Sequence, residues 1–314
     1  MENLVTAVSV TVPLILLMFL GMLLRTLKCI DAGFIRVANK LNYNVFLPCS
    51  VFAGTYSSRF DLSEGGNVLL TVLVSVTIMF FISILVSVLI TDKKHARGTI
   101  ITGMFRSNYG YVGLPVVNSI LGAESCLLAS MSLVVTSIVS NVYTPLGFSI
   151  NNSEVKLSIK KILKDVFCNV YLIVTIIAVI LMLCHCPEFP APIHKTIASL
   201  GSVCTPLAMI ALGANLNLKK IVGNRKVLNC VNLFRLVIFP LIGTFICILL
   251  GFRSESLTVL FVLYACPAAT LLFTVSQEMG GDTDLASQIV AVGTVLSMVT
   301  MTIGIFVLKS FLVI

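Results

Sequence analysis

Long stretches of this chain contain no charged residue at all. Eight of them are uninterrupted and recur from end to end: 3–24, 41–58, 65–91, 125–153, 166–187, 196–218, 256–277 and 285–308. Two more, 98–123 and 227–252, are interrupted once each, by Arg106 and Arg235. An apolar helix of about 20 residues crosses the hydrocarbon core of a bilayer. The pattern predicts an all-α polytopic membrane protein with ten transmembrane helices and almost no soluble domain.

Composition excludes several other classes of protein. An ordinary soluble domain does not fit, because 58% of the residues are hydrophobic and only 11% are charged. The net charge of +8 does not indicate nucleic-acid binding, because the positive residues lie in short loops between the apolar stretches. Cys184, His185 and Cys186 supply only three ligands, whereas structural zinc sites use four. We therefore expect neither a metal nor another cofactor.

The positive residues are distributed unequally between alternate loops. With the N-terminus outside, the loops on the cytoplasmic side hold fifteen lysines and arginines, and the loops on the opposite side hold four. Loops rich in positive charge resist translocation across the membrane. The asymmetry predicts that both termini lie outside, and we expect the protein in the plasma membrane, which is the inner membrane of the cell.

The longest predicted cytoplasmic connection divides the ten stretches into two sets of five. Residues 1–150 and 166–314 would each form a five-helix repeat, with 151–165 as the linker. Because five is odd, the second repeat would have the opposite orientation, as in many secondary transporters. Three pairs match at an offset of 158 residues: Pro48 with Pro206, Gly122 with Gly280, and Glu124 with Asp282. The matches favour an inverted repeat, with each acid at a helix N-terminus.

Two of the predicted crossings contain helix-breaking residues near their middle. The fourth combines Asn108, Gly110, Gly113 and Pro115, and the ninth contains Pro267 among small residues. Because proline removes a donor and glycine tolerates non-helical dihedrals, we expect the fourth crossing to unwind from Asn108 to Pro115. Unwound backbone persists in a membrane only where it lines an enclosed cavity. Two matching breaks therefore indicate a transport site, whose half-helix N-termini favour an anion such as a carboxylate.

Polar side chains near these breaks are candidates for substrate binding. Asn108 and Asn118 offer amide donors without a buried charge. Arg106 either attracts a substrate anion or extends along its stem to the cytoplasmic interface. Asn44 either reaches the site or lies at the interface. Arg235 has no polar neighbourhood in the sequence, and we expect a structural pairing there.

Two runs of residues resemble the auxin efflux carrier family. They are Asn108-x-x-x-x-Gly113-x-Pro115 ending at Gly122, and Pro267 through Gln277-Glu278 followed by Asp284 and Ser287. The resemblance covers essentially the whole chain. The short central loop is similar to the bacterial branch, often called malate or malonate permeases, more than to the long-looped PIN-type auxin transporters. Leu272 stands where plant-type members have a second proline, so an auxin-like substrate is not implied.

The resemblance implies a division of labour among the crossings. Spans 1, 2, 6 and 7 would form a scaffold, and spans 3–5 and 8–10 would form a transport domain that moves like an elevator. Discontinuous helices 4 and 9 would cross at the substrate site, and a homodimer through the scaffold is compatible with the family. The candidate substrate-binding residues are Arg106, Asn108, Tyr109, Gly113, Pro115, Asn118, Cys266, Pro267, Ala268 and Asn44.

These observations predict a secondary transporter that moves a small organic anion, a carboxylate, by alternating access. No Asp or Glu lies near the centre of a predicted crossing, so the sequence shows no intramembrane proton carrier. An anion channel and a sodium-coupled symporter remain as alternatives. An enzyme is not expected, because the chain has no HExxH motif and no GxxxxGK[ST] loop, and His95 and His194 fall in predicted loops.

Overall fold

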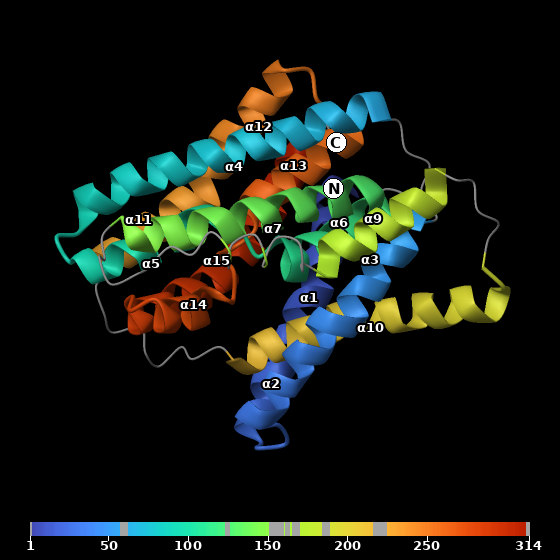
Figure 1. Ribbon diagram of the computed structural model, residues 1–314, viewed down its shortest axis with the longest axis horizontal. Coiled ribbons are helices and arrows are strands. Elements are labelled where there is room, and N and C mark those ends of the chain that lie inside the picture. The colour runs from blue at the N-terminus through green and yellow to red at the C-terminus, as the bar shows by residue number, and fades with distance from the viewer. Residues whose placement is uncertain are drawn as a thin grey trace.

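The computed structural model describes residues 2–56, 62–122, 126–150, 160, 164, 170–183, 189–215 and 225–311. Throughout these ranges the ordered elements are helices, apart from one isolated β-bridge (Figure 1). The predicted all-helical class is therefore confirmed for the part of the chain that is described. In chain order the first elements are α1 (Glu2–Thr26), α2 (Ala32–Leu41), η1 (Asn42–Phe46), α3 (Leu47–Tyr56), α4 (Leu62–Ile90), α5 (Lys94–Phe105), η2 (Tyr109–Gly113), α6 (Leu114–Leu121) and α7 (Cys126–Ser149). The others are α9 (Val170–Leu183), α10 (Ala191–Asn215), α11 (Arg225–Leu233), η5 (Phe234–Ile238), α12 (Phe239–Leu249), α13 (Ser254–Ala265), α14 (Leu272–Glu278) and α15 (Thr283–Ser310).

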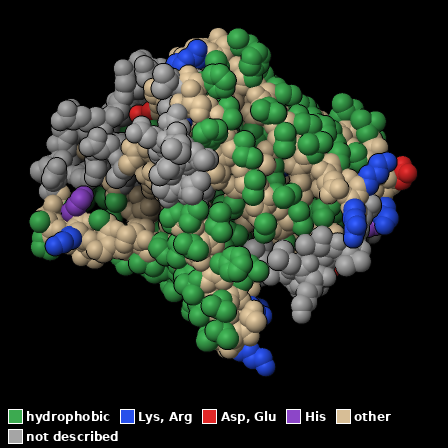
Figure 2. Space-filling model, turned by 180° about the vertical axis from the view of Figure 1, so that it is seen from behind, with side chains coloured by type: hydrophobic (Ala, Val, Ile, Leu, Met, Phe, Trp, Pro, Cys, Tyr) green, Lys and Arg blue, Asp and Glu red, His purple; other side chains and the backbone are tan. Residues whose placement is uncertain are grey.

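Five of the described helices are long and apolar enough to cross a membrane. They are Gly65–Ile90, Leu127–Ser149, Ala191–Ala214, Arg225–Leu249 and Thr283–Ser310. Their outer faces carry large apolar side chains, and green hydrophobic residues cover much of the face seen in Figure 2. Leu89 on α4 and Leu249 on α12, for example, are 74% and 70% exposed. Contiguous apolar surface on this scale suits lipid rather than water, and it supports an integral membrane protein.

Three of the described helices contain a five-residue π-helical segment, and each segment ends two residues before a proline. The segments η1, η2 and η5 precede Pro48, Pro115 and Pro240. Proline lacks the N–H that would continue the i→i−4 ladder, and its ring crowds the carbonyl one turn earlier. A wider π turn accommodates the missing bond without ending the helix. Pro206, the predicted counterpart of Pro48, lies inside α10 with no such segment.

The helix α10 packs closely against α1, α2 and α3, in the lower half of Figure 1. Glycine makes the approach to α1 close, because a Cβ at Gly213 would overlap the backbone carbonyl of Met18. In the same way, a Cβ at Gly21 would overlap the carbonyl of Ile210. Small residues at helix contacts let backbones meet where no apolar side chain would fit. The α1–α10 pair is therefore held by backbone-to-backbone packing.

In a second set of helices, α4, α7, α14 and α15 each pack against α5. The helix α15 begins at Asp282, whose carboxylate accepts a hydrogen bond from the backbone N–H of Leu285 at 2.9 Å. An acid at this helix start was predicted, and for Asp282 the prediction is confirmed. Its predicted counterpart, Glu124, lies outside the described residues.

Candidate functional site

The fourth predicted crossing is interrupted for three residues. The helix α5 ends at Phe105, and the next residue, Arg106, has an extended backbone (φ −81°, ψ 108°). Helical structure resumes at Tyr109 in η2 and continues into α6. A break here was predicted, but the expected extent, from Asn108 to Pro115, is wrong. The π-helical segment accommodates Pro115, so most of that stretch stays helical.

The ninth predicted crossing is interrupted between α13 and α14. Cys266 follows α13 in an extended conformation (φ −59°, ψ 143°), and α14 begins at Leu272. Pro267 therefore lies in a gap between two helical pieces, as the sequence predicts. Proline and the small residues that follow it do not supply the donors and packing that would carry a helix through this point.

The two breaks meet each other inside the protein. The backbone N–H of Asn108 donates to the carbonyl of Pro267 at 2.8 Å, and the N–H of Ala269 donates to the carbonyl of Arg106 at 3.0 Å. Ser107 and Ala268 lie opposite each other between these bonds, in an antiparallel bridge. Backbone groups freed by one break thus pair with groups freed by the other, which satisfies them away from water.

Arg235 lies against the helical ends that enter this crossing. Its side chain is only 2% exposed, and its guanidinium donates to four backbone carbonyls. They are Cys266 (2.7 Å), Leu263 (3.1 Å), Met104 (3.2 Å) and Phe105 (3.4 Å). Met104 and Phe105 end α5, and Leu263 and Cys266 lie at the end of α13. The predicted structural pairing is present, and the partners are main-chain carbonyls.

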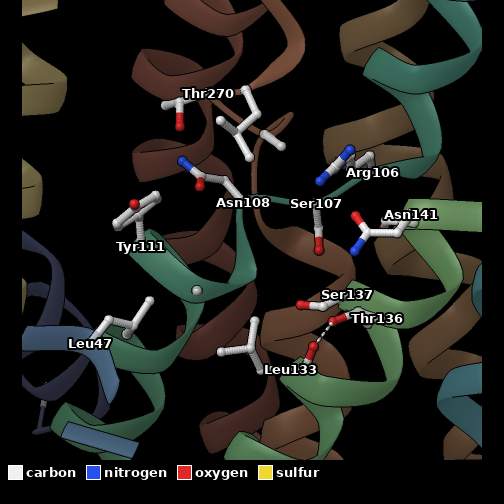
Figure 3. A pocket seen from close by; sticks show the side chains of 14 residues that line it. Leu47, Arg106, Ser107, Asn108, Tyr111, Leu133, Thr136, Ser137, Asn141 and Thr270 are labelled. Carbon is white, nitrogen blue, oxygen red and sulfur yellow. Dashed lines mark hydrogen bonds between the residues drawn. The ribbon is translucent and has the colours of Figure 1, made fainter. Parts of the chain in front are cut away.

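A cavity of about 90 Å³ lies beside the crossing (Figure 3). Its walls come from both breaks and from α7, with Leu47 of α3 as a further contact. Its polar lining side chains are Arg106, Ser107, Asn108, Tyr111, Thr136, Ser137, Ser140, Asn141 and Thr270. The lining residues include one cation and no carboxylate. Hydroxyls, amides and a guanidinium can donate hydrogen bonds to an anion, so this arrangement suits a small negatively charged ligand.

Asn108 is the most buried of these polar side chains. It is 4% exposed, and its Nδ2 has no hydrogen-bond partner among the described residues. In Figure 3 Asn108 lies with Tyr111 and Thr270 on one side of the view, and Arg106 lies with Asn141 on the other. A buried donor without a partner costs about 1–3 kcal/mol. A ligand oxygen in the cavity would remove that cost, so the amide marks a place for an acceptor.

Arg106 lies beside the cavity. Its Nη1 donates to Thr144 Oγ1 on α7 at 3.2 Å, and the residue lines the cavity wall. The structure places this side chain at the cavity wall, and its attraction of an anion stays a prediction. The residues that line the cavity with it include no carboxylate.

The other predicted residues lie in four different settings. Pro267 and Ala268 contribute backbone to the crossing, whereas Tyr109, Gly113, Pro115 and Cys266 are buried in its packing and do not line the cavity. Asn118 lies farther along α6. Asn44 is exposed, and its Nδ2 donates to the carbonyl of Lys40 at 2.8 Å within its own helix. Asn44 does not line this cavity, and its contact with the substrate stays a prediction.

Sequence reasoning missed the wall formed by α7. Thr136, Ser137, Ser140 and Asn141 all line the cavity, and they recur at helical spacing within the uncharged stretch 125–153. Polar residues three and four apart share one helix face. That periodicity was the available signal.

No group of three metal-ligating side chains occurs among the described residues, and the Cys184–Cys186 segment lies outside them.

Comparison with known proteins adds an independent observation. The family described as membrane transport protein matches residues 6–305 of this chain. A protein of Methanothermobacter thermautotrophicus, named an uncharacterized transporter, is 26% identical over 294 residues. That alignment covers 91% of this chain and 93% of the relative. Both similarities extend over both broken helices and over the cavity between them.

Proposed function

The chain belongs to the membrane transport protein family, and from this premise we propose that it is a secondary transporter of a small organic anion. The cavity at the crossing would be the binding site, and a carboxylate would be the group it recognises. The observation that carries the proposal is the buried Asn108 amide without a partner, in a cavity that also holds Arg106 and no acid. Such a site favours the binding of a negatively charged hydrogen-bond acceptor.

The size of the cavity narrows the class of substrate. At about 90 Å³ it is smaller than the roughly 300–1,000 Å³ pockets that hold drug-sized ligands. A short carboxylate such as malonate or malate fits this space better than an indole acid does. This supports the bacterial, malate- or malonate-permease-like branch of the auxin efflux carriers, and it agrees with Leu272 in place of the plant-type proline.

We further propose ten crossings in two inverted five-helix repeats. The antiparallel bridge between Ser107 and Ala268 supports opposite orientations for the two broken helices. Gly122 and Gly280, which match at the repeat offset, both have positive φ (79° and 65°), and each follows the second piece of its broken helix. Glycine adopts that conformation without steric cost. We also propose a scaffold and a transport domain with an elevator-like movement. The contacts of α10 with α1–α3, and of α5 with α7, α14 and α15, lie within these proposed domains, and the contacts of α1 with α15 and of α3 with α7 would join the two.

We place both termini outside the cell, because fifteen of the loop lysines and arginines would then face the cytoplasm and four would not. Membrane-impermeant labelling of a cysteine tag at each end, in intact cells, would test this orientation in the plasma membrane. Both tags should react in intact cells. Reaction of one tag only would give an odd number of crossings and would contradict the ten-helix arrangement.

The transport proposal can be tested with purified protein. We expect malonate or malate to raise the midpoint of thermal unfolding, because a ligand that binds only the folded state stabilises it. Indole-3-acetate should do so less. In liposomes, an internal load of the same carboxylate should accelerate uptake of radiolabelled carboxylate by counterflow. Parallel assays with and without sodium would reveal a coupled cation. Flux that rises linearly with concentration and shows no counterflow would indicate a channel instead.

A further inference from the structure

We propose that Arg235 makes the cavity prefer negatively charged substrates, although Arg235 itself does not touch the substrate. It would do so by neutralising the ends of two helices. The inference rests on the proposed function, because it concerns which ligands the same cavity accepts. Arg235 would be a positioning residue rather than a binding residue.

Arg235 is an unusual cation in this protein. It is the one charged residue among the described side chains that are buried, and no carboxylate forms an ion pair with it within the described ranges. Its donors instead go to the last carbonyls of α5 and of α13, at 2.7–3.4 Å. A buried charge is costly unless it is compensated. The compensation here is the partial negative charge of two helix C-termini.

The magnitudes of these charges nearly match. A helix C-terminus carries about half a negative elementary charge, so two C-termini carry about one. Arg235 adds one positive charge at hydrogen-bonding distance from both. In a buried, low-dielectric setting these charges act on one another and on nearby groups more strongly than in water. The crossing is therefore left nearly neutral on the side of α5 and α13.

This neutralisation matters for the cavity because the two helix ends adjoin its wall. Phe105 directly precedes Arg106, and Cys266 lies three residues before Ala269, and both Arg106 and Ala269 line the cavity. Without Arg235, the two C-termini would present negative potential to a carboxylate and would offset the positive charge of Arg106. With Arg235, the two helix ends no longer oppose a carboxylate, and the cavity accepts anions more readily.

A purely structural strut would make the same hydrogen bonds, so the experiment must separate charge from support. Arg235→Gln removes the charge and retains donors, and Arg235→Lys retains the charge and loses the forked geometry. Arg253→Gln is a matched control, because Arg253 also donates to backbone carbonyls, those of Ile248 and Phe252, but is exposed at another helix end. The probes are malonate and its monoamide malonamate, which has one negative charge fewer.

Calorimetric titration of the purified full chain would give both affinities. We expect Arg235→Gln to lower malonate affinity by about tenfold or more, and the malonate-to-malonamate preference by at least about threefold. Arg235→Lys should keep the preference close to that of the unaltered protein, and Arg253→Gln should change neither quantity. Equal losses for both probes would show a structural role only and would overturn the proposal.

The folding outcome of the variants also has a defined meaning. If Arg235→Gln does not fold, Arg235→Lys decides: a retained preference supports the proposal, and a lost preference contradicts it. If neither variant folds, Arg235 is a structural strut and the proposal is withdrawn. Failure of the unaltered protein to bind malonate or malonamate would instead count against the proposed carboxylate site, and would remove this inference with it.

Discussion

Asn108→Ala should lower substrate affinity by about 10- to 100-fold and leave the folded protein at normal abundance. A hydrogen bond to a charged group contributes about 1.5–3 kcal/mol, and the alanine variant would lose one such bond to the carboxylate. Stability should not fall, because Nδ2 has no partner in the described structure and its removal ends a desolvation cost. The Asn108 backbone N–H, which bonds to Pro267, is unaffected by the change.

Two measurements would check this prediction. Titration with malonate or malate reports affinity, and size-exclusion chromatography with thermal unfolding reports the amount and stability of folded protein. Asn67→Ala is the matched control, because the same amide is removed from an exposed position on α4 that does not line the cavity. Its affinity should stay close to that of the unaltered protein. Full binding by Asn108→Ala would remove Asn108 from the site.

Gly213→Ala should destabilise the protein by about 3 kcal/mol or more, although alanine is normally the better residue in a helix. The added Cβ would overlap the Met18 carbonyl, which is backbone and cannot rotate away. The helices α1 and α10 would have to separate along their contact, and each would lose close packing over several turns. Thermal unfolding and the yield of monodisperse protein would measure the effect.

Gly66→Ala provides the control for this prediction. Gly66 lies in α4, and a Cβ there would meet no atom within 4 Å. The same substitution should therefore be neutral or stabilising by up to about 1 kcal/mol, because alanine loses less conformational entropy on folding. A Gly213→Ala variant as stable as the Gly66→Ala variant would show that α1 and α10 do not depend on this backbone contact.

The sequence predicted the helical class and the two interrupted helices from local features. Uncharged stretches gave the helices, and Pro115, Pro267 and their small neighbours indicated where a membrane helix would break. The extent of the first break was wrong, because a π-helical turn before Pro115 preserves the helix. Such a turn depends on how the segment packs, which local composition does not reveal. The number of crossings and the inverted repeat stay predictions.

The candidate site was predictable only where its residues adjoin the breaks. Asn108 and Arg106 were found because a polar residue inside an apolar stretch is conspicuous. The carbonyl partners of Arg235 could not be found, because backbone ends of distant helices carry no sequence signature. Asn44 donates a side-chain hydrogen bond one turn back in its own helix, and its contact with the substrate stays a prediction. Only the folded arrangement decides between such local and long-range partners.

The backbone pairing at the crossing has a mechanical consequence. Two main-chain bonds join the broken helices, and Arg235 donates to carbonyls of the helical pieces that lead into them. Because of these bonds, we expect the two broken helices to move together as one rigid unit in any conformational change. Leu47 is the cavity-lining residue from α1–α3, and under the proposed movement it would stay behind. The boundary between the moving transport domain and the stationary scaffold would then run beside Leu47.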